Sequence, residues 1–160
     1  MTGKYHEFTS GRQQPSSPFW WFIRDLSASY GQTDYTKTAL WTNLSKIDID
    51  GKRPTGKVYD HAMQGFLELL IREVSIVKPD VLILMTTNPN YQWHLSEKFA
   101  LAAGVSKRES LIPNQLFHWE TDILPVNTFQ ICHPNRLRFT VGGYKQNAEQ
   151  IIEAIRQQVH

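Results

Sequence analysis

Apolar side chains recur with helical spacing in several segments of the chain. After Ser17 and Pro18, residues suited to the N-cap and first turn of a helix, apolar side chains follow at three- and four-residue intervals as far as Gly31. A second stripe of this kind stops at Lys78-Pro79, where proline cannot continue a helix. The pattern predicts helices over residues 18–30, 59–77 and 93–103, and a last one after Gly142-Gly143.

Short apolar runs between these helices have the composition of strands. Residues 80–85, DVLILM, are continuously apolar after the aspartate, as expected for a strand covered on both faces. Residues 38–44 (TALWTNL) and 126–132 (VNTFQIC) are rich in β-formers and also predict strands. Residues 105–125 have no clear period, although LFHW at 116–119 fits a short strand.

The alternation of helices and strands predicts an α/β fold with a mostly parallel sheet and helices on both faces. In such sheets ligands bind beyond the carboxyl ends of the strands. Three polar loops leave these ends, with the sequences NLSKID, TTNPNYQ and HPNRLRF. Residues 1–16 have no apolar pattern and are expected to form a loose, polar lead-in, so residues 17–160 form a single α/β domain.

The composition limits the classes of protein to which this chain can belong. The 160 residues are 41% hydrophobic, enough for one domain with a core, and a net charge of +2 permits a nucleic-acid partner without requiring one. The single cysteine, Cys132, excludes an intrachain disulfide and multi-cysteine metal sites, and indicates a reducing, cytoplasmic setting. No run of eighteen apolar residues occurs, so no membrane span is expected. A monomer without a cofactor or metal is expected.

The strand predicted over 126–132 runs directly into HPNRLRF, a stretch with candidate chemistry. Pro134 prevents an immediate helix, so the ring of His133 is held at the strand end, where it could donate a hydrogen bond to developing negative charge. Arg136 and Arg138 could hold phosphates while Leu137 enters a base stack. A structural His–Pro turn, and a solvated loop with one residue tucked into the core, explain the same residues.

Asn43, at the end of TALWTN, carries an amide that can donate and accept, and so could read the edge of a base. An asparagine that turns the chain after a strand is the common alternative. The G-x-x-x-x-G-K match at 51–57 is followed by Val58 rather than Ser or Thr, so a surface loop is favoured there. Four aromatic residues could stack on a base or simply pack in the core, namely Phe19, Trp20, Tyr91 and Trp93.

In order along the chain, WTNLSKID, KPDVLILMTTNPNY and CHPNRLRF resemble the uracil-DNA glycosylase superfamily, and more narrowly its uncharacterised bacterial members. The resemblance covers roughly residues 17–140. It implies a three-layer α/β/α sandwich around a short parallel sheet, acting on a flipped, deaminated base in DNA during base excision repair. It also implies that Asn43 recognises the base, that His133 stabilises negative charge on the base oxygen, and that Leu137 enters the duplex.

Further roles follow from the same resemblance. Asn135 replaces the serine of the family's His-Pro-Ser motif, and with Tyr91 and Phe19 it would contact the base. Arg136 and Arg138 would contact DNA. Flipping a base costs a few kcal/mol of unstacking, which an inserted side chain and phosphate contacts offset.

The chain departs from the family at the first motif, a Gly-Gln-rich loop that positions the attacking water. Gly31-Gln32-Thr33 follows a polar turn and comes too late to be this motif, and Asp34, Asp48 or Asp50 could take its place as the base. The expected function is an N-glycosylase of this type, truncated or inactive if nothing replaces that motif. A catalytically inactive nucleic-acid-binding module of the same fold, and an α/β domain with an unrelated small ligand, are the alternatives.

Overall fold

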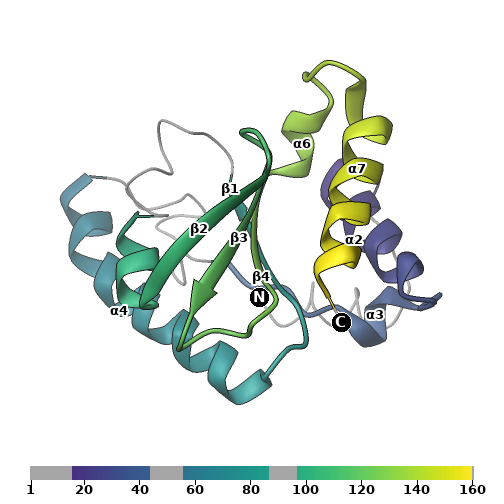
Figure 1. The fold of residues 1–160 in the computed structure, drawn as a ribbon. Coiled ribbons are helices and arrows are strands. Elements are labelled where there is room, and N and C mark those ends of the chain that lie inside the picture. Colours follow the sequence, from purple (N-terminus) through teal and green to yellow (C-terminus); the bar gives the residue numbers. More distant parts are fainter. Residues whose placement is uncertain (1–15, 44–55, 87–96, 160) are drawn as a thin grey trace.

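The computed structural model describes residues 16–43, 56–86 and 97–159. In chain order (Figure 1) the labelled elements are α2 (Pro18–Ser29), α3 (Tyr35–Thr38), α4 (Gly56–Val77), β1 (Leu82–Thr86), β2 (Val105–Ile112), β3 (Leu116–Thr121), β4 (Thr128–Cys132), α6 (Pro134–Leu137) and α7 (Gly143–Gln158). Residues 97–102, between β1 and β2, are helical as well.

Most of the predicted elements are confirmed. The helical stripes correspond to α2, α4 and α7, and residues 97–102 form the described part of the helix expected over 93–103. The apolar runs at 80–85 and 126–132 correspond to β1 and β4, and LFHW begins β3. Residues 1–15 of the expected lead-in and residues 51–55 of the surface loop expected over 51–57 lie outside the described residues, whereas Gly56 and Lys57 begin α4, so the expected loop is wrong at these two positions. The single-domain organisation stays a prediction.

The four strands form one mixed sheet in the order β1-β4-β3-β2. Only β1 and β4 are parallel, whereas β4–β3 and β3–β2 are antiparallel. The α/β class is therefore confirmed, but the expected mostly parallel sheet is wrong for these strands. The reason is that β2 and β3 are joined by a tight turn, with Asn114 at a positive φ of 58°, and a connection this short can link only antiparallel strands.

Helices cover both faces of the sheet (Figure 1). On one face α2 and α7 bury Phe22 and Ile151 against β1, β3 and β4, and on the other α4 buries Leu67 against β1 and β3. Within β1, Ile83 and Met85 belong to the first cluster and Leu82 and Leu84 to the second. This two-sided burial explains why the strand is continuously apolar.

The strand expected over 38–44 is wrong for its described part. Residues 35–38 form the single turn of α3, and residues 39–43 are irregular. The carboxylate of Asp34 accepts a hydrogen bond from the backbone N–H of Thr36 at 3.2 Å and so caps this turn. Capping by the side chain just before the β-forming residues favours a helical turn over a strand.

Candidate functional site

The carboxyl ends of β1 and β4 lie side by side, because the two strands are parallel and Thr86 pairs with Cys132. The chain leaves β4 directly into His133, which is the N-cap of α6. This places His133 at the edge of the sheet where ligands bind in open α/β folds. The loop at 87–96, which follows β1 and contains Tyr91 and Trp93, lies outside the described residues.

Local hydrogen bonding fixes the protonation of His133. The backbone N–H of Asn135 donates to Nδ1 of the ring at 3.2 Å. An Nδ1 that accepts carries no proton, so the neutral ring has its hydrogen on Nε2. The half-buried position lowers the pKa of the imidazole by desolvation, which favours this neutral form. His133 is therefore a neutral donor, and among the described residues no acceptor engages Nε2.

An aromatic cluster flanks this ring. Phe19 of α2 stacks nearly parallel to His133, with ring centroids 5.8 Å apart and an angle of 19° between the planes. Phe19 also contacts Trp20 edge-on at 4.9 Å, and Trp20 contacts Trp41 edge-on at 5.7 Å. The indole N–H of Trp41 is buried and has no hydrogen-bond partner among the residues that the structure describes. The cluster thus connects the start of α2 and the segment after α3 to the His133 site.

Asn43 lies two residues beyond Trp41 and has an exposed side chain. Its neighbour Thr42 donates a hydrogen bond from Oγ1 to Oε2 of Glu73 on α4 at 3.3 Å. Within the described part of the chain Asn43 and His133 share no hydrogen bond. The structure therefore brings Phe19 and His133 together, while the pairing of Asn43 with His133 across one pocket stays a prediction.

The four residues after Pro134 have very different exposure. Leu137 is fully buried in the cluster between α2, α7 and the sheet, so it cannot enter a base stack without leaving the core. The role of inserted residue expected for Leu137 is therefore corrected to that of a core residue. Asn135, Arg136 and Arg138 are exposed.

Two exposed apolar residues lie in the turn between α6 and α7, and the sequence analysis did not identify them. Phe139 is 87% exposed and Val141 is 100% exposed. The signal for them was the segment RFTVGG, where two apolar residues separated by one polar residue precede a Gly-Gly turn. They belong to neither the strand before them nor the amphipathic stripe of the helix after them.

The carboxylate of Asp34, one candidate for activating water, is already engaged by neighbouring groups. It accepts from the backbone and hydroxyl of Thr36 and forms an ion pair with Lys37 at 3.2 Å. The hydrogen bond from the Thr36 hydroxyl is the main reason why the pKa of Asp34 is lowered. Asp48 and Asp50 lie outside the described residues. None of the contacts within residues 16–43, 56–86 and 97–159 brings a carboxylate to the ring of His133.

Cys132, next to the histidine, has a protonated thiol. Burial raises its pKa, and the positive charge of Arg136 opposes this only in part. In the part of the chain that the structure describes, no group of three His, Cys, Asp or Glu side chains could hold a metal ion.

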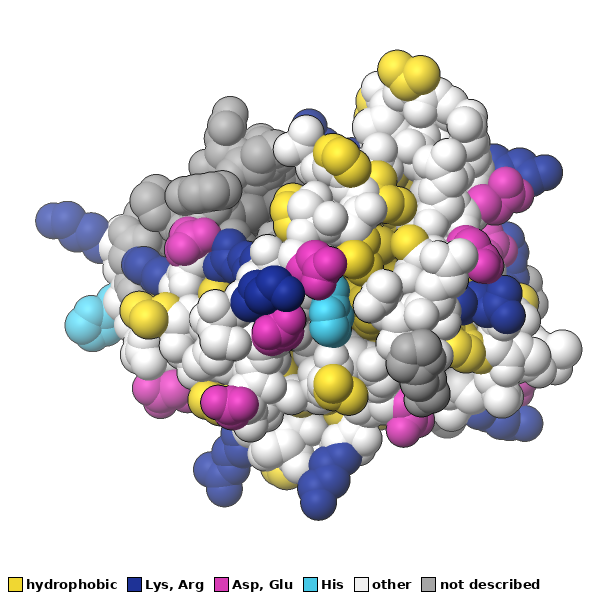
Figure 2. All heavy atoms as spheres, viewed as in Figure 1, with side chains coloured by type: hydrophobic (Ala, Val, Ile, Leu, Met, Phe, Trp, Pro, Cys, Tyr) yellow, Lys and Arg dark blue, Asp and Glu magenta, His cyan; other side chains and the backbone are white. Residues whose placement is uncertain are grey.

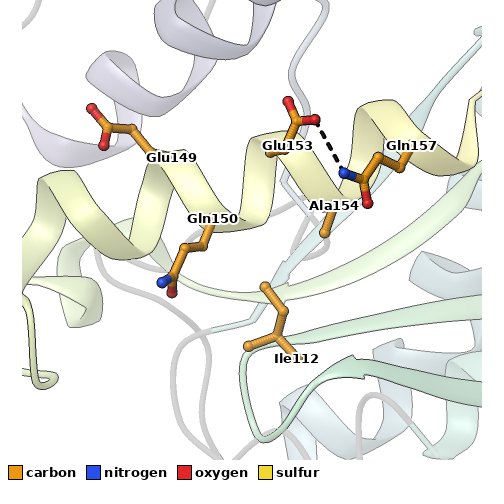
Figure 3. A pocket seen from close by; sticks show the side chains of 6 residues that line it. All are labelled: Ile112, Glu149, Gln150, Glu153, Ala154 and Gln157. Atoms are coloured by element: carbon orange, nitrogen blue, oxygen red, sulfur yellow. Dashed lines mark hydrogen bonds between the residues drawn. The ribbon is translucent and has the colours of Figure 1, made fainter.

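A hollow of about 500 Å³ lies elsewhere, between α7 and the end of β2 (Figure 3). It is lined by carboxylates, amides and small apolar groups, with Glu153 accepting from Nε2 of Gln157 at 3.1 Å. Its lining residues are Ile112, Glu149, Gln150, Glu153, Ala154 and Gln157. Because this lining has two carboxylates and no Lys or Arg, the hollow does not suit a phosphate group.

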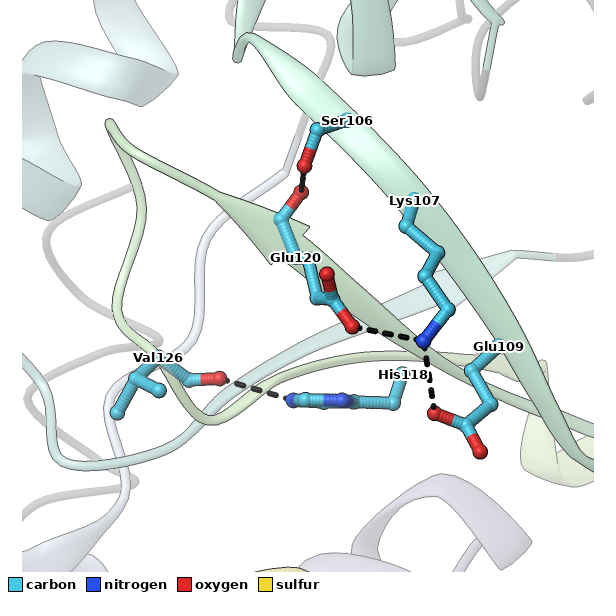
Figure 4. A network of polar contacts seen from close by, with 6 residues as sticks. All are labelled: Ser106, Lys107, Glu109, His118, Glu120 and Val126. Atoms are coloured by element: carbon cyan, nitrogen blue, oxygen red, sulfur yellow. Dashed lines mark hydrogen bonds and ion pairs between the residues drawn. The ribbon is translucent and has the colours of Figure 1, made fainter.

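A network of polar contacts runs across the strands of the β2–β3 hairpin (Figure 4). Lys107 Nζ lies 2.9 Å from Glu120 Oε1 and 3.6 Å from Glu109 Oε2, and Nε2 of His118 lies 2.9 Å from the carbonyl oxygen of Val126. These charges satisfy one another, so this face is not a basic surface for nucleic acid.

Comparisons with models of protein families, with curated proteins and with solved structures find no match to this chain. Function is therefore inferred from the residues at the carboxyl ends of β1 and β4. Of the helices that the structure describes, none combines the length and the apolar character needed to cross a membrane.

Proposed function

We propose that this chain is a uracil-DNA glycosylase-like protein that binds an extruded base of DNA beside His133 and cleaves the bond between base and sugar. The observation that carries the proposal is the neutral ring of His133, whose Nδ1 is held by the backbone and whose Nε2 carries the hydrogen. In this hydrolysis the oxygen of a water molecule bonds to the sugar carbon and the water loses a proton, while the electron pair of the broken N-glycosidic bond leaves with the base as negative charge. A fixed donor aimed at the base oxygen stabilises that charge without a metal.

Neighbouring groups support the same proposal. Phe19 forms an aromatic wall against the ring, and the exposed amide of Asn135 lies two residues beyond it. Asn43 and Tyr91 would complete recognition of the base. The exposed Arg136 and Arg138 would contact DNA phosphates. Helices on both faces of the sheet fit the three-layer sandwich of the family.

The second candidate is a binding module of the same fold that does not cleave. It is favoured by the state of Asp34, which caps α3 and pairs with Lys37 instead of holding a water. Such a module would use His133 and Phe19 to hold an extruded base, and would lack a group that activates water for attack on the sugar.

A base-release assay separates these candidates. The purified chain is incubated with single- and double-stranded oligonucleotides that contain uracil, hypoxanthine or a thymine mismatch. His133→Ala is the test variant, and His118→Ala is the matched control, since His118 is a histidine of the hairpin network away from β1. We expect release by the wild type and the control, and a loss of about 100- to 1000-fold in His133→Ala, the usual effect of removing such a donor.

Each result has a distinct meaning. Binding without release in the wild type would replace the glycosylase with the binding module. Release that persists in His133→Ala would remove His133 from catalysis and overturn the proposed mechanism. A chain that neither binds nor releases bases would overturn both candidates.

A further inference from the structure

β2 lies at the edge of the sheet (Figure 1). It is the last strand in the order β1-β4-β3-β2, so among the strands that the structure describes only β3 pairs with it. The backbone N–H and C=O groups along the outer side of such a strand can pair with another chain. Four of its eight residues are exposed, namely Ser106, Lys107, Glu109 and Ser110. β2 is therefore an accessible edge.

The exposed charges of β2 have both signs. Lys107 and Glu109 lie two residues apart, on the same face of the strand, and their charged groups are 3.6 Å from each other (Figure 4). Figure 2 shows basic and acidic side chains close together over the hairpin. An edge with lysine alone repels a second copy of itself. An edge with Lys and Glu two residues apart can instead match a second copy.

A two-fold axis fixes how two such strands match. In an antiparallel pair of identical strands, each residue faces the residue at the same distance on the other side of a central position. With Arg108 at the centre, Lys107 of each copy faces Glu109 of the other. The other facing residues are alike, serine with serine and aliphatic with aliphatic: Ser106 with Ser110, and Val105 with Leu111. A centre at Lys107 or at Glu109 would place like charges opposite each other.

Arg108 can lie on the axis because its charge is already matched within its own chain. Its Nη1 is 2.7 Å from Oε1 of Glu97, and its guanidinium covers the ring of Trp119 at 4.9 Å. These contacts lie on the face of the strand opposite to Lys107 and Glu109. The pairing of β2 with β3 is regular from position 107 to position 110, so the backbone around the axis is suited to a further strand.

We propose that the outer edge of β2 binds a second copy of this chain. Two copies pair antiparallel about Arg108 and extend the sheet across the interface, through backbone hydrogen bonds and two ion pairs between Lys107 and Glu109. The ammonium of Lys107 carries three hydrogens, so it can keep its contact with Glu120 at 2.9 Å. This dimer replaces the monomer expected from the sequence. It does not rest on the proposed function, because β3 separates β2 from the strands that carry the His133 site.

The test is sedimentation velocity of the full chain over a range of protein concentrations. Lys107→Glu and Glu109→Lys each place like charges opposite each other in a dimer of the variant. In a mixed dimer of the two variants, every facing pair again has opposite charges. Lys78→Glu is the matched control, because Lys78 is exposed and lies before β1, at the other edge of the sheet.

We expect the wild type to form a reversible dimer. Each single variant should weaken association about tenfold or more, since two attractive pairs become repulsive. An equimolar mixture of the two variants should dimerise, and so should the variant that carries both substitutions. Lys78→Glu should associate as the wild type does. Circular dichroism would verify that the variants keep the fold, as expected for substitutions of exposed side chains.

A wild type that sediments as a monomer at every concentration would overturn the inference. A dimer that persists in Lys107→Glu and Glu109→Lys, or a mixture of the two that stays monomeric, would exclude this pairing of β2. An equal loss in Lys78→Glu would assign the effect to net charge and would also overturn it. Base release that depends on His133 would leave the proposed function standing in each of these cases.

Discussion

The two nitrogens of the His133 ring have different tasks. Nδ1 accepts from the backbone of Asn135 and makes the ring the cap of α6, which leaves the hydrogen on Nε2. A proton on Nδ1 would break this hydrogen bond. The conformation of the loop and the protonation state of the ring are therefore coupled, so that the same contact that positions the donor also keeps it neutral.

This coupling predicts a pH dependence of stability. Burial lowers the pKa of His133, so the folded state binds a proton more weakly than the unfolded state. The stabilising contribution is present above the unfolded pKa of about 6.5 and is lost as the pH falls below it. His133→Asn keeps an acceptor for the N–H of Asn135 but cannot titrate. Urea unfolding between pH 5 and 8 should show the wild type losing stability relative to this variant only on the acid side; a relative gain there would contradict the lowered pKa.

At the scale of elements, the single helical turn of α6 and the turn that follows it divide their side chains between core and solvent. Leu137 is fully buried and Phe139 is 87% exposed. We expect Leu137→Ala to lower the free energy of unfolding by about 2–5 kcal/mol, because it leaves a cavity in the core. Phe139→Ala should change it by less than about 0.5 kcal/mol. Chemical denaturation of both variants measures the difference, and similar effects would contradict the assignment of Leu137 to the core and of Phe139 to the surface.

Long periodic segments were the most predictable elements. α2, α4 and α7 each repeat the helical period often enough to be recognised, and β1 is apolar on both faces because helices cover both. The sequence pattern does not predict β2. This strand lies at the edge of the sheet, and on its inner face a charged residue takes the place of an apolar one. Arg108 there covers the ring of Trp119 at 4.9 Å, where an apolar residue would have signalled a strand.

The candidate site was predictable in its position but not in the orientation of its side chains. The run into His133-Pro134 placed the histidine at the end of β4, as observed. A four-residue helix is too short for any period to appear, so the pattern could not indicate that Leu137 points inward and Phe139 outward. That choice is made by the packing of α2 and α7, which the local sequence does not contain.

At the scale of the whole molecule, one sheet carries the two larger hydrophobic clusters. β1 contributes Ile83 to the cluster under α7 and Leu84 to the cluster under α4, and β3 likewise contributes Leu116 and Phe117. Neither cluster can be disrupted without exposing the opposite side of the same strands. The two layers of helices are therefore expected to lose their structure together.

Calorimetry should accordingly show one unfolding transition, with equal calorimetric and van't Hoff enthalpies. Leu67→Ala, in the cluster under α4, and Ile151→Ala, in the cluster under α7, each remove a side chain that is almost fully buried. Each should lower the midpoint of the whole transition, at a cost of about 2–5 kcal/mol. Leu101→Ala is the control, because Leu101 is 85% exposed and should leave the midpoint unchanged. A second transition in either core variant would mean that the two faces of the sheet unfold independently, and residues 17–160 would then not be a single cooperative domain.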